Sequence, residues 1–254
     1  LGEGEKDVVE FQKRLQTVFG LSYVAFARSI RQEVEEMKKV IAEMVRNDPV
    51  VRQAKTVRVL TKRSNKQFAL TSMEVNKQLG EFLIKEFGKT IDLVDADATI
   101  WVEIVEKYCF VYTSQIHCLN GLPVGVSGKV VALVSGGIDS PVAAFYAMKR
   151  GCAVKFVHFF NETINSKESL GKVKELVKVL SEYNKNTKLY VVPFKDVQFE
   201  IIKKVPQAYR MVVYKRMMMR IASHIARQED AQALIVGDSL GQVSSQVLAN
   251  LQVI

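Results

Sequence analysis

The stretch that decides the fold is Val131-Ala132-Leu133-Val134-Ser135-Gly136-Gly137-Ile138-Asp139-Ser140-Pro141. Its four leading apolar residues predict the end of a buried strand, and Pro141 fits the first turn of a helix, where an amide hydrogen is not needed. The glycines allow a sharp turn, and the helix-start amides and serine hydroxyls can donate to phosphate oxygens. The stretch therefore predicts an anion-binding loop, although it lacks the lysine of a Walker A loop.

The chain after this loop alternates between apolar runs and helical patterns. The candidate strands are Val130–Val134, Ala153–Phe159, Leu189–Phe194 and Ala233–Gly237, and the candidate helices are Pro141–Arg150, Leu170–Leu180 and Val212–Ala226. Strands that alternate with helices form mainly parallel sheets through right-handed crossovers. Ligands of such folds bind at the carboxyl ends of the strands, so that edge is the predicted site.

The chain before the loop has a different pattern. Strand-like alternation occurs at 57–60, 100–104 and 108–112, and Thr71-Ser72-Met73-Glu74 predicts a capping box ahead of an amphipathic helix. Helical character is also expected within Phe11–Leu15 and Gln32–Met44. This reads as a small α+β module that ends near Cys118, followed by a glycine- and proline-containing linker.

Composition narrows the class of partner. With 254 residues, 48% hydrophobic and 25% charged, the chain is an ordinary globular protein, which excludes disorder and fibrous repeats as its main character. The net charge of +9 favours an anionic partner. Two windows contain no acidic residue, Pro49–Met73 and Ile201–Gln228, and two such windows in one chain favour a polyanion over a merely solvated cationic face.

Three cysteines without CxxC spacing predict neither a disulfide framework nor a structural metal site, and a cytoplasmic protein is expected. We expect Cys109, Cys118 and Cys152 to be structural thiols. No segment is predicted to enter a membrane. Met217, Met218 and Met219 are expected to pack in the core.

The Ser135–Ser140 loop resembles the SGGxDS signature of the PP-loop ATP pyrophosphatases. Its flanks, Gly121–Gly125, Ser140–Ala143 and Gly237–Gln246, resemble the tRNA 4-thiouridine synthetases, also called tRNA sulfurtransferases. The module before it, with Lys62-Arg63 and Leu70-Thr71-Ser72, resembles the THUMP domain of those enzymes.

The resemblance implies an α/β fold with a parallel-sheet PP-loop domain of the adenine nucleotide α-hydrolase type. It divides the chain into a partial ferredoxin-like segment (1–27), a THUMP RNA-binding domain (28–118), a linker (119–128) and a PP-loop domain (129–254). The implied activity is that of a tRNA uridine 4-sulfurtransferase, which adenylates the uridine at position eight of tRNA with ATP so that sulfur replaces oxygen, giving 4-thiouridine. The implied partners are tRNA and a persulfide-carrying sulfur donor such as a cysteine desulfurase, and a homodimer is expected.

The family match also implies site residues. Those carried over to the nucleotide are Leu133, Val134, Ser135, Gly136, Gly137, Asp139, Ser140, His158, Phe159, Lys215, Gly237 and Gln246. Asp139 is the candidate catalytic carboxylate, because an acid beside phosphates is expected to hold Mg²⁺ or to orient a loop amide. Asp238 is a second candidate, and simple loop capping is the alternative for both. The predicted RNA contacts are Arg52, Lys55, Arg58, Lys62, Arg63 and Lys66.

Three interpretations stay open at this point. The first is the thiolating enzyme, the second is a tRNA-binding module without catalysis, and the third is another PP-loop enzyme such as a small-metabolite amidating synthetase. No persulfide cysteine is assigned, and we expect it beyond Ile254, in a chain that is a fragment or has gaps. A shared role of the sulfur in thiamine biosynthesis, known in some relatives, is not decided by the residues.

Overall fold

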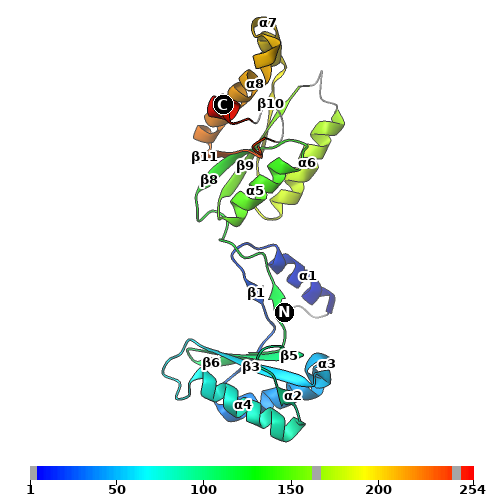
Figure 1. Cartoon of the computed structure of the whole chain (residues 1–254), viewed down its shortest axis with the longest axis vertical. Helices are drawn as coiled ribbons and strands as arrows, with labels where there is room; N and C mark the ends of the chain where they lie inside the picture. The colour runs from blue at the N-terminus through cyan, green and yellow to red at the C-terminus, as the bar shows by residue number, and fades with distance from the viewer. Residues whose placement is uncertain (1–4, 162–166, 242–246) are drawn as a thin grey trace. The chain divides into compact units, whose positions relative to one another are not determined.

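The structure of this chain is a computed structural model that describes residues 5–161, 167–241 and 247–254 (Figure 1). It contains two compact units, one formed by the residues up to Ser22 together with Cys118–Ile254, and the other by Tyr23–His117. We call them the α/β unit and the α+β unit, and each is described by itself. The elements are α1 (Glu5–Gln16), β1 (Tyr23–Val24), β2 (Arg28–Ile30), α2 (Val34–Asn47), α3 (Pro49–Gln53), β3 (Thr56–Arg63), α4 (Ser72–Phe87), β4 (Thr90–Ile91), β5 (Ala98–Val105), β6 (Tyr108–Tyr112), β7 (Ile116–His117), β8 (Lys129–Leu133), α5 (Asp139–Lys149), β9 (Ala153–Phe160), α6 (Lys167–Ser181), β10 (Leu189–Pro193), α7 (Lys195–Lys204), the 3₁₀ turn η1 (Gln207–Tyr209), α8 (Arg210–Gln228), β11 (Ala233–Ile235) and α9 (Leu248–Gln252).

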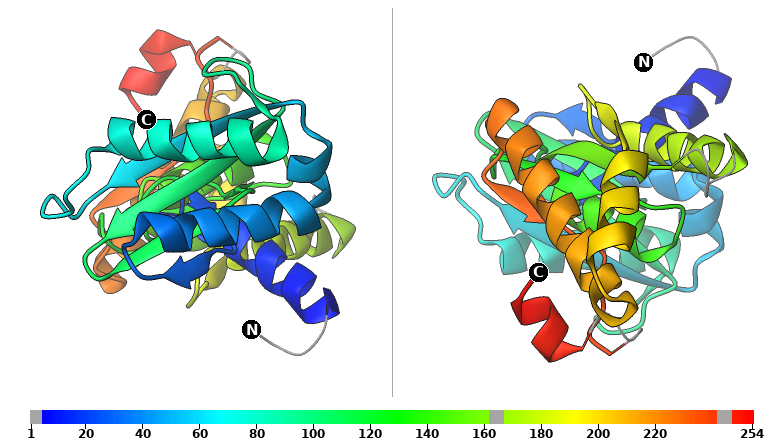
Figure 2. Two further views of the ribbon diagram at one scale, coloured as in Figure 1. Left: turned by 90° about the horizontal axis from the view of Figure 1, so that it is seen from below. Right: turned by 90° about the horizontal axis from the view of Figure 1, so that it is seen from above.

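The α+β unit is a mixed five-stranded sheet with helices on one face. The strand order is β2-β6-β5-β3-β4, in which β3 runs parallel to β4 and β5, while β6 is antiparallel to β5 and β2. Helices α2 and α4 lie side by side across one face of this sheet (Figure 2). A short antiparallel pair, β1 with β7, joins the two ends of the unit.

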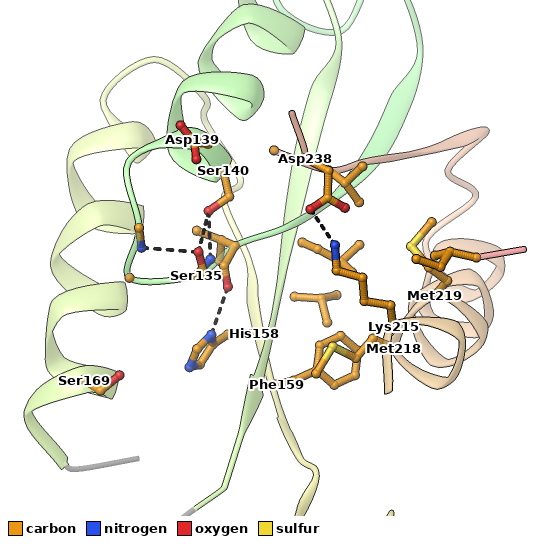
Figure 3. Close-up of a pocket in the computed structure, with 18 residues that line it drawn as sticks. Ser135, Asp139, Ser140, His158, Phe159, Ser169, Lys215, Met218, Met219 and Asp238 are labelled. Carbon is orange, nitrogen blue, oxygen red and sulfur yellow. Dashed lines mark hydrogen bonds and ion pairs between the residues drawn. The ribbon is translucent and has the colours of Figure 1, made fainter. Parts of the chain in front are cut away.

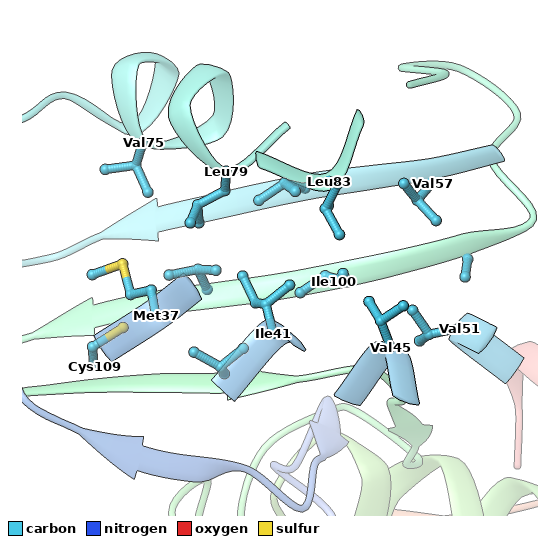
Figure 4. Close-up of a cluster of buried hydrophobic side chains, with 14 of the residues drawn as sticks. Met37, Ile41, Val45, Val51, Val57, Val75, Leu79, Leu83, Ile100 and Cys109 are labelled. Carbon is cyan, nitrogen blue, oxygen red and sulfur yellow. The ribbon is translucent and has the colours of Figure 1, made fainter. Parts of the chain in front are cut away.

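Alternation along the strands creates the core of this unit. Val57 and Val59 of β3 are buried, and they pack with Ile41 of α2 and Leu79 of α4 (Figure 4). The predicted capping box of α4 is confirmed, since the Thr71 hydroxyl accepts from the Glu74 amide and the Glu74 carboxylate accepts from the Thr71 amide.

Cys109 belongs to the same core. It is fully buried on β6, and this burial raises the pKa of its thiol to about 12. Because the thiolate is the reactive form of cysteine, Cys109 is a structural residue at neutral pH. The sequence prediction is therefore supported for this thiol.

The α/β unit is a four-stranded parallel sheet between two helical layers. The strand order is β10-β9-β8-β11 and every neighbouring pair is parallel. Helices α5 and α6 cover one face and α8 the other (Figure 1). Val130 and Ala132 of β8 pack toward α5 and α6, whereas Val131 packs toward α8. The predicted α/β fold with a parallel sheet is confirmed.

Segments far apart in the sequence complete this unit. Phe19, which follows α1, lies in the core against the rings of Phe145 and Tyr183, with centroid distances of 5.2 and 5.5 Å. Residues 119–128 are hydrogen-bonded to the end of α5, for example from the Leu122 amide to the Lys149 carbonyl. The segment predicted as a linker is thus packed against the α/β unit.

Two helices of this unit, α7 and α9, were not predicted. The segment Lys195–Lys204 forms α7, which packs against α8, although its sequence suggested no element. Within the described ranges, no helix is both long and apolar enough to cross a bilayer.

Replacing Phe19 with alanine is expected to destabilise the α/β unit by about 3–5 kcal/mol, because a buried ring leaves a cavity between two other rings. The measurement is urea unfolding followed by circular dichroism and by the fluorescence of Trp101, the single tryptophan, which lies in the α+β unit. The circular dichroism transition should shift and the Trp101 transition should not. Phe11→Ala, at a side chain 46% exposed, is the control, and equal effects of the two changes would contradict the packing of Phe19.

Candidate functional site

The loop between β8 and α5 is held in shape by its own hydroxyl groups. The Ser135 amide donates to Ser140 Oγ at 2.9 Å, and the Gly137 amide donates to Ser135 Oγ at 3.2 Å. Ser140 is only 8% exposed, so this bond is shielded from water. The amides of Gly136 and Ile138 donate to no other group in the described part of the chain. Amides that have no partner at a helix start are suited to bind an anion.

The position of this loop in the sheet favours ligand binding. Strand β8 lies between β9, which follows it in the chain, and β11, which comes last. The order of connection therefore reverses between β8 and β11, which is where open parallel sheets have a crevice at their carboxyl edge.

A cavity of about 420 Å³ opens at this edge (Figure 3). That volume lies within the range of small-molecule sites, roughly 300–1,000 Å³. It is lined by Leu133, Val134, Ser135, Gly136, Gly137, Asp139, Ser140, Val157, His158, Phe159, Ser169, Lys215, Met218, Met219, Val236, Gly237, Asp238 and Ile254.

One wall of the cavity is apolar and belongs to the α8 side of the sheet. Strand alternation places Leu133 and Phe159 on the face that packs toward α8, because Val131 and Val157 face the same way. Met218 and Met219 of α8 close this wall. Together they form an apolar slot next to the loop, suited to a flat aromatic group.

An ion pair crosses the cavity near the slot. Lys215 Nζ of α8 lies 2.9 Å from Asp238 Oδ1, and the two side chains are 20% and 26% exposed. The pair holds a cation inside the cavity, within reach of a ligand's charge.

Gly237 lets the end of β11 touch the start of α5. A Cβ atom at this position would lie 2.4 Å from the Ser140 amide nitrogen, closer than any real contact. Only glycine fits here without displacing the helix start that shapes the loop.

His158 lies on the opposite side of the sheet edge from the apolar slot. Its Nδ1 is 2.9 Å from the Val134 carbonyl oxygen, and the residue is 5% exposed. Its other ring nitrogen, Nε2, is buried and has no hydrogen-bond partner among the described residues.

The structure brings the predicted nucleotide residues together in this one cavity, apart from Gln246, which lies outside the described residues. Met218 and Met219, expected in the core, instead line the cavity. Ser169 and Lys172 were also missed. Lys172 Cδ would be 3.7 Å from a Cβ placed on Gly136, so this lysine of α6 lies beside the loop. Only the spacing of Ser169 and Lys172 along an amphipathic helix could have suggested them. That spacing does not show which face of the helix lines a cavity.

The predicted RNA contacts lie in the α+β unit and differ in their surroundings. Arg63 donates to the carbonyls of Phe68 and Leu70, and Arg58 donates to Leu93 and Thr99, so both guanidiniums are used by the protein itself. The other four predicted cations, Arg52, Lys55, Lys62 and Lys66, are exposed.

The carboxylates of the cavity suit a magnesium ion brought by phosphates rather than a preformed metal site. No cluster of three or more metal-ligating side chains occurs within the described residues. Asp139, in the first turn of α5, and Asp238 both line the cavity, and Mg²⁺ is usually held by one or two carboxylates plus phosphate oxygens.

The α/β unit has a parallel sheet with a Ser-Gly-Gly loop at its switch point, and the same chain contains a separate α+β unit. This combination defines a PP-loop protein with an accessory domain. The chain belongs to the ThiI family: residues 125–254 match the family described as "Thiamine biosynthesis protein (ThiI)", and residues 31–114 match the THUMP domain.

The names of similar proteins support this family assignment. A "Probable tRNA sulfurtransferase" from Caldanaerobacter subterraneus is 42% identical over 99% of this chain, and one from Thermoanaerobacter pseudethanolicus is 40% identical over 99%. The chain spans 65% of the length of each of these relatives.

Solved structures agree on the fold. The crystal structure of a 4-thiouridine synthetase–RNA complex with bound ATP aligns with a TM-score of 0.79 and 33% identity, covering 95% of this chain and 64% of that one. A protein from Pyrococcus horikoshii, at 24% identity, aligns with a TM-score of 0.69 over 97% of this chain and 74% of its own, and supports the fold alone.

Replacing Ser140 with alanine is expected to destabilise the α/β unit by about 1–3 kcal/mol, because the Ser135 amide loses its acceptor in a shielded place. The measurement is the urea midpoint from circular dichroism. Ser181→Ala, which removes a hydroxyl bonded only to an exposed helix carbonyl, is the control and should shift the midpoint far less. An unchanged midpoint for Ser140→Ala would show that the hydroxyl does not hold the loop.

Proposed function

We propose that this protein is a tRNA uridine 4-sulfurtransferase that uses ATP to adenylate the uridine at position eight of tRNA, so that sulfur can replace oxygen and give 4-thiouridine. The observation that carries the proposal is the single cavity that joins an anion-binding loop, an apolar slot and a lysine at the switch point of the sheet. The similarity to a 4-thiouridine synthetase bound to RNA and ATP supports the same activity.

Different regions of the cavity suit different parts of ATP. The loop amides and the start of α5 would bind the phosphates, and the slot of Leu133, Phe159, Met218 and Met219 would hold adenine. Lys215 would exchange its partner Asp238 for phosphate oxygens and so stabilise negative charge in the transition state. Mg²⁺, when bound through Asp139, would neutralise charge on the leaving pyrophosphate.

The domain division proposed for this activity is a THUMP RNA-binding domain at 28–118 and a PP-loop domain at 129–254, with 1–27 as part of a ferredoxin-like domain. A persulfide-carrying donor such as a cysteine desulfurase would supply the sulfur, and the protein would act as a homodimer. Cys109 is too deeply buried to carry the sulfur.

The deciding experiment is incubation of the full-length protein with radiolabelled ATP, with and without tRNA. Formation of AMP and pyrophosphate that depends on tRNA supports the proposal. Turnover that is independent of tRNA would favour a small-metabolite synthetase, and RNA binding without turnover would favour a binding module.

Asp139→Ala is expected to lower the tRNA-dependent rate by about 100-fold or more, the loss typical of removing one electrostatic contact to a reacting phosphate. Its affinity for tRNA, measured by filter binding, should stay within about twofold of the original, since the RNA contacts proposed above lie elsewhere. Asp230→Ala, at an exposed carboxylate, is the control. A normal rate in Asp139→Ala would limit this carboxylate to loop capping.

Lys62→Ala and Lys66→Ala are each expected to weaken tRNA binding and to reduce the slope of log K against log salt by about 1, because each removes one phosphate contact. The measurement is filter binding across a salt series. Lys77→Ala is the control, since Lys77 lies on α4 in a weak pair with Glu81. If the three variants keep the same slope, tRNA does not bind through these lysines.

A further inference from the structure

Lys172 of α6 places an ammonium group beside the loop that follows β8. Its Cδ atom would lie 3.7 Å from a Cβ atom placed on Gly136, and the ammonium group follows after one further methylene group. The amide of Gly136 also donates to no acceptor in the described part of the chain. A cation and a free amide donor are therefore held at the same residue of the loop.

Lys172 lies on the face of α6 that is turned toward the cavity. Ser169, three residues earlier on the same helix, lines the cavity, and residues three apart share one face of a helix. Figure 3 shows Ser169 on α6, whose ribbon runs beside the loop. Lys172 is exposed and forms no ion pair with any residue that the structure describes, so its charge is available to a ligand.

The charges that line the cavity do not by themselves match a triphosphate. Among the described residues, the lining side chains include two carboxylates, Asp139 and Asp238, and one ammonium group, Lys215, which is already paired with Asp238. A polyphosphate would therefore meet a net negative charge, and a further cation at the loop lowers that electrostatic cost. Lys172 can supply this cation without breaking an existing ion pair.

The position of Lys172 determines which end of a bound nucleotide it would contact. The apolar slot and Lys215 lie on the α8 side of the sheet, whereas α6 covers the other face. A nucleotide with its base in the slot and its phosphates on the loop would extend toward α6. The β- and γ-phosphates, which are farthest from the base, would then lie nearest to Lys172.

We propose that Lys172 is a catalytic residue that binds the β- and γ-phosphates of ATP and stabilises the leaving pyrophosphate. The inference rests on the proposed function. When uracil O4 attacks the α-phosphorus, a new O–P bond forms, the bond from the α-phosphorus to the bridging oxygen breaks, and that oxygen leaves with the electron pair. The N3 proton of the uracil is released to water. The Lys172 ammonium keeps its protons and neutralises part of the charge that develops on pyrophosphate.

The test compares Lys172→Ala, Lys172→Arg and the control Lys174→Ala in the full-length protein. Lys174 is also exposed on α6, but residues two apart do not share a face of a helix, so it should not reach the loop. Calorimetry measures the affinities for pyrophosphate and for AMP, each with Mg²⁺ and without tRNA. Lys172→Ala should bind pyrophosphate about tenfold or more weakly, since a contact to a charged group is lost, and should bind AMP within about twofold of the unaltered protein.

Turnover provides the second measurement. Release of pyrophosphate that depends on tRNA should fall about 100-fold or more in Lys172→Ala, the typical effect of removing one group that stabilises charge in the transition state. Lys172→Arg keeps the positive charge and should recover most of the lost rate. Lys174→Ala should keep the rate and both affinities of the unaltered protein.

Three outcomes would overturn the inference: an unchanged pyrophosphate affinity or turnover in Lys172→Ala, an AMP affinity that falls as far as the pyrophosphate affinity, or an equal loss in Lys174→Ala. Absence of tRNA-dependent pyrophosphate release from the unaltered protein would contradict the proposed function itself. The pyrophosphate affinities are measured without tRNA and test Lys172 separately, so the two failures are distinguishable.

Discussion

The peptide plane between Val134 and Ser135 is the constraint on which the site depends. Its carbonyl accepts from His158 Nδ1 and its amide donates to Ser140 Oγ, each at 2.9 Å. Because a peptide unit is planar and rigid, the histidine ring and the first turn of α5 are fixed by the same group of atoms. A rotation of this plane would release both at once.

The parallel sheet makes this arrangement possible because successive residues point to opposite faces. At the end of β9, His158 turns toward the α5–α6 layer and Phe159 toward α8. A single strand end therefore supplies a polar group to one side of the cavity and an apolar wall to the other. The cavity then presents two chemically different regions on either side of one loop.

Much of the fold followed from the sequence because its causes are local. The buried strands of the α/β unit, the capping box at Thr71 and the loop after β8 each depend on neighbouring residues, and all occur where the patterns predicted them. Helix α7 was missed although Val197 and Ile201 have helical spacing, because the segment is short and it packs against α8, a contact that the local sequence does not reveal. Met218 and Met219 were assigned to the core because helical spacing identifies an apolar face. It does not show whether that face packs in the core or lines a cavity.

Hydrogen bonds that form only in the folded unit also limited the prediction of the charged sites. Arg58 and Arg63 occur in the acid-free window like Lys62 and Lys66, yet their guanidiniums bind carbonyls and a hydroxyl of the α+β unit. Arginine has several fixed donors and can bridge two acceptors of the fold, as both guanidiniums do here. The acid-free window Pro49–Met73 therefore contains cations that stabilise the fold and cations that are exposed to an anionic partner. Only the folded structure distinguishes the two groups.

The two sides of the cavity differ in how binding energy becomes available. On the nucleotide side, Lys215 already has Asp238 as its partner, so a phosphate gains only the difference between two ion pairs. On the other side, His158 Nε2 is buried and has no hydrogen-bond partner among the residues that the structure describes, so its burial carries an uncompensated cost. The paired lysine is therefore placed where it can select for the negative charge of a ligand.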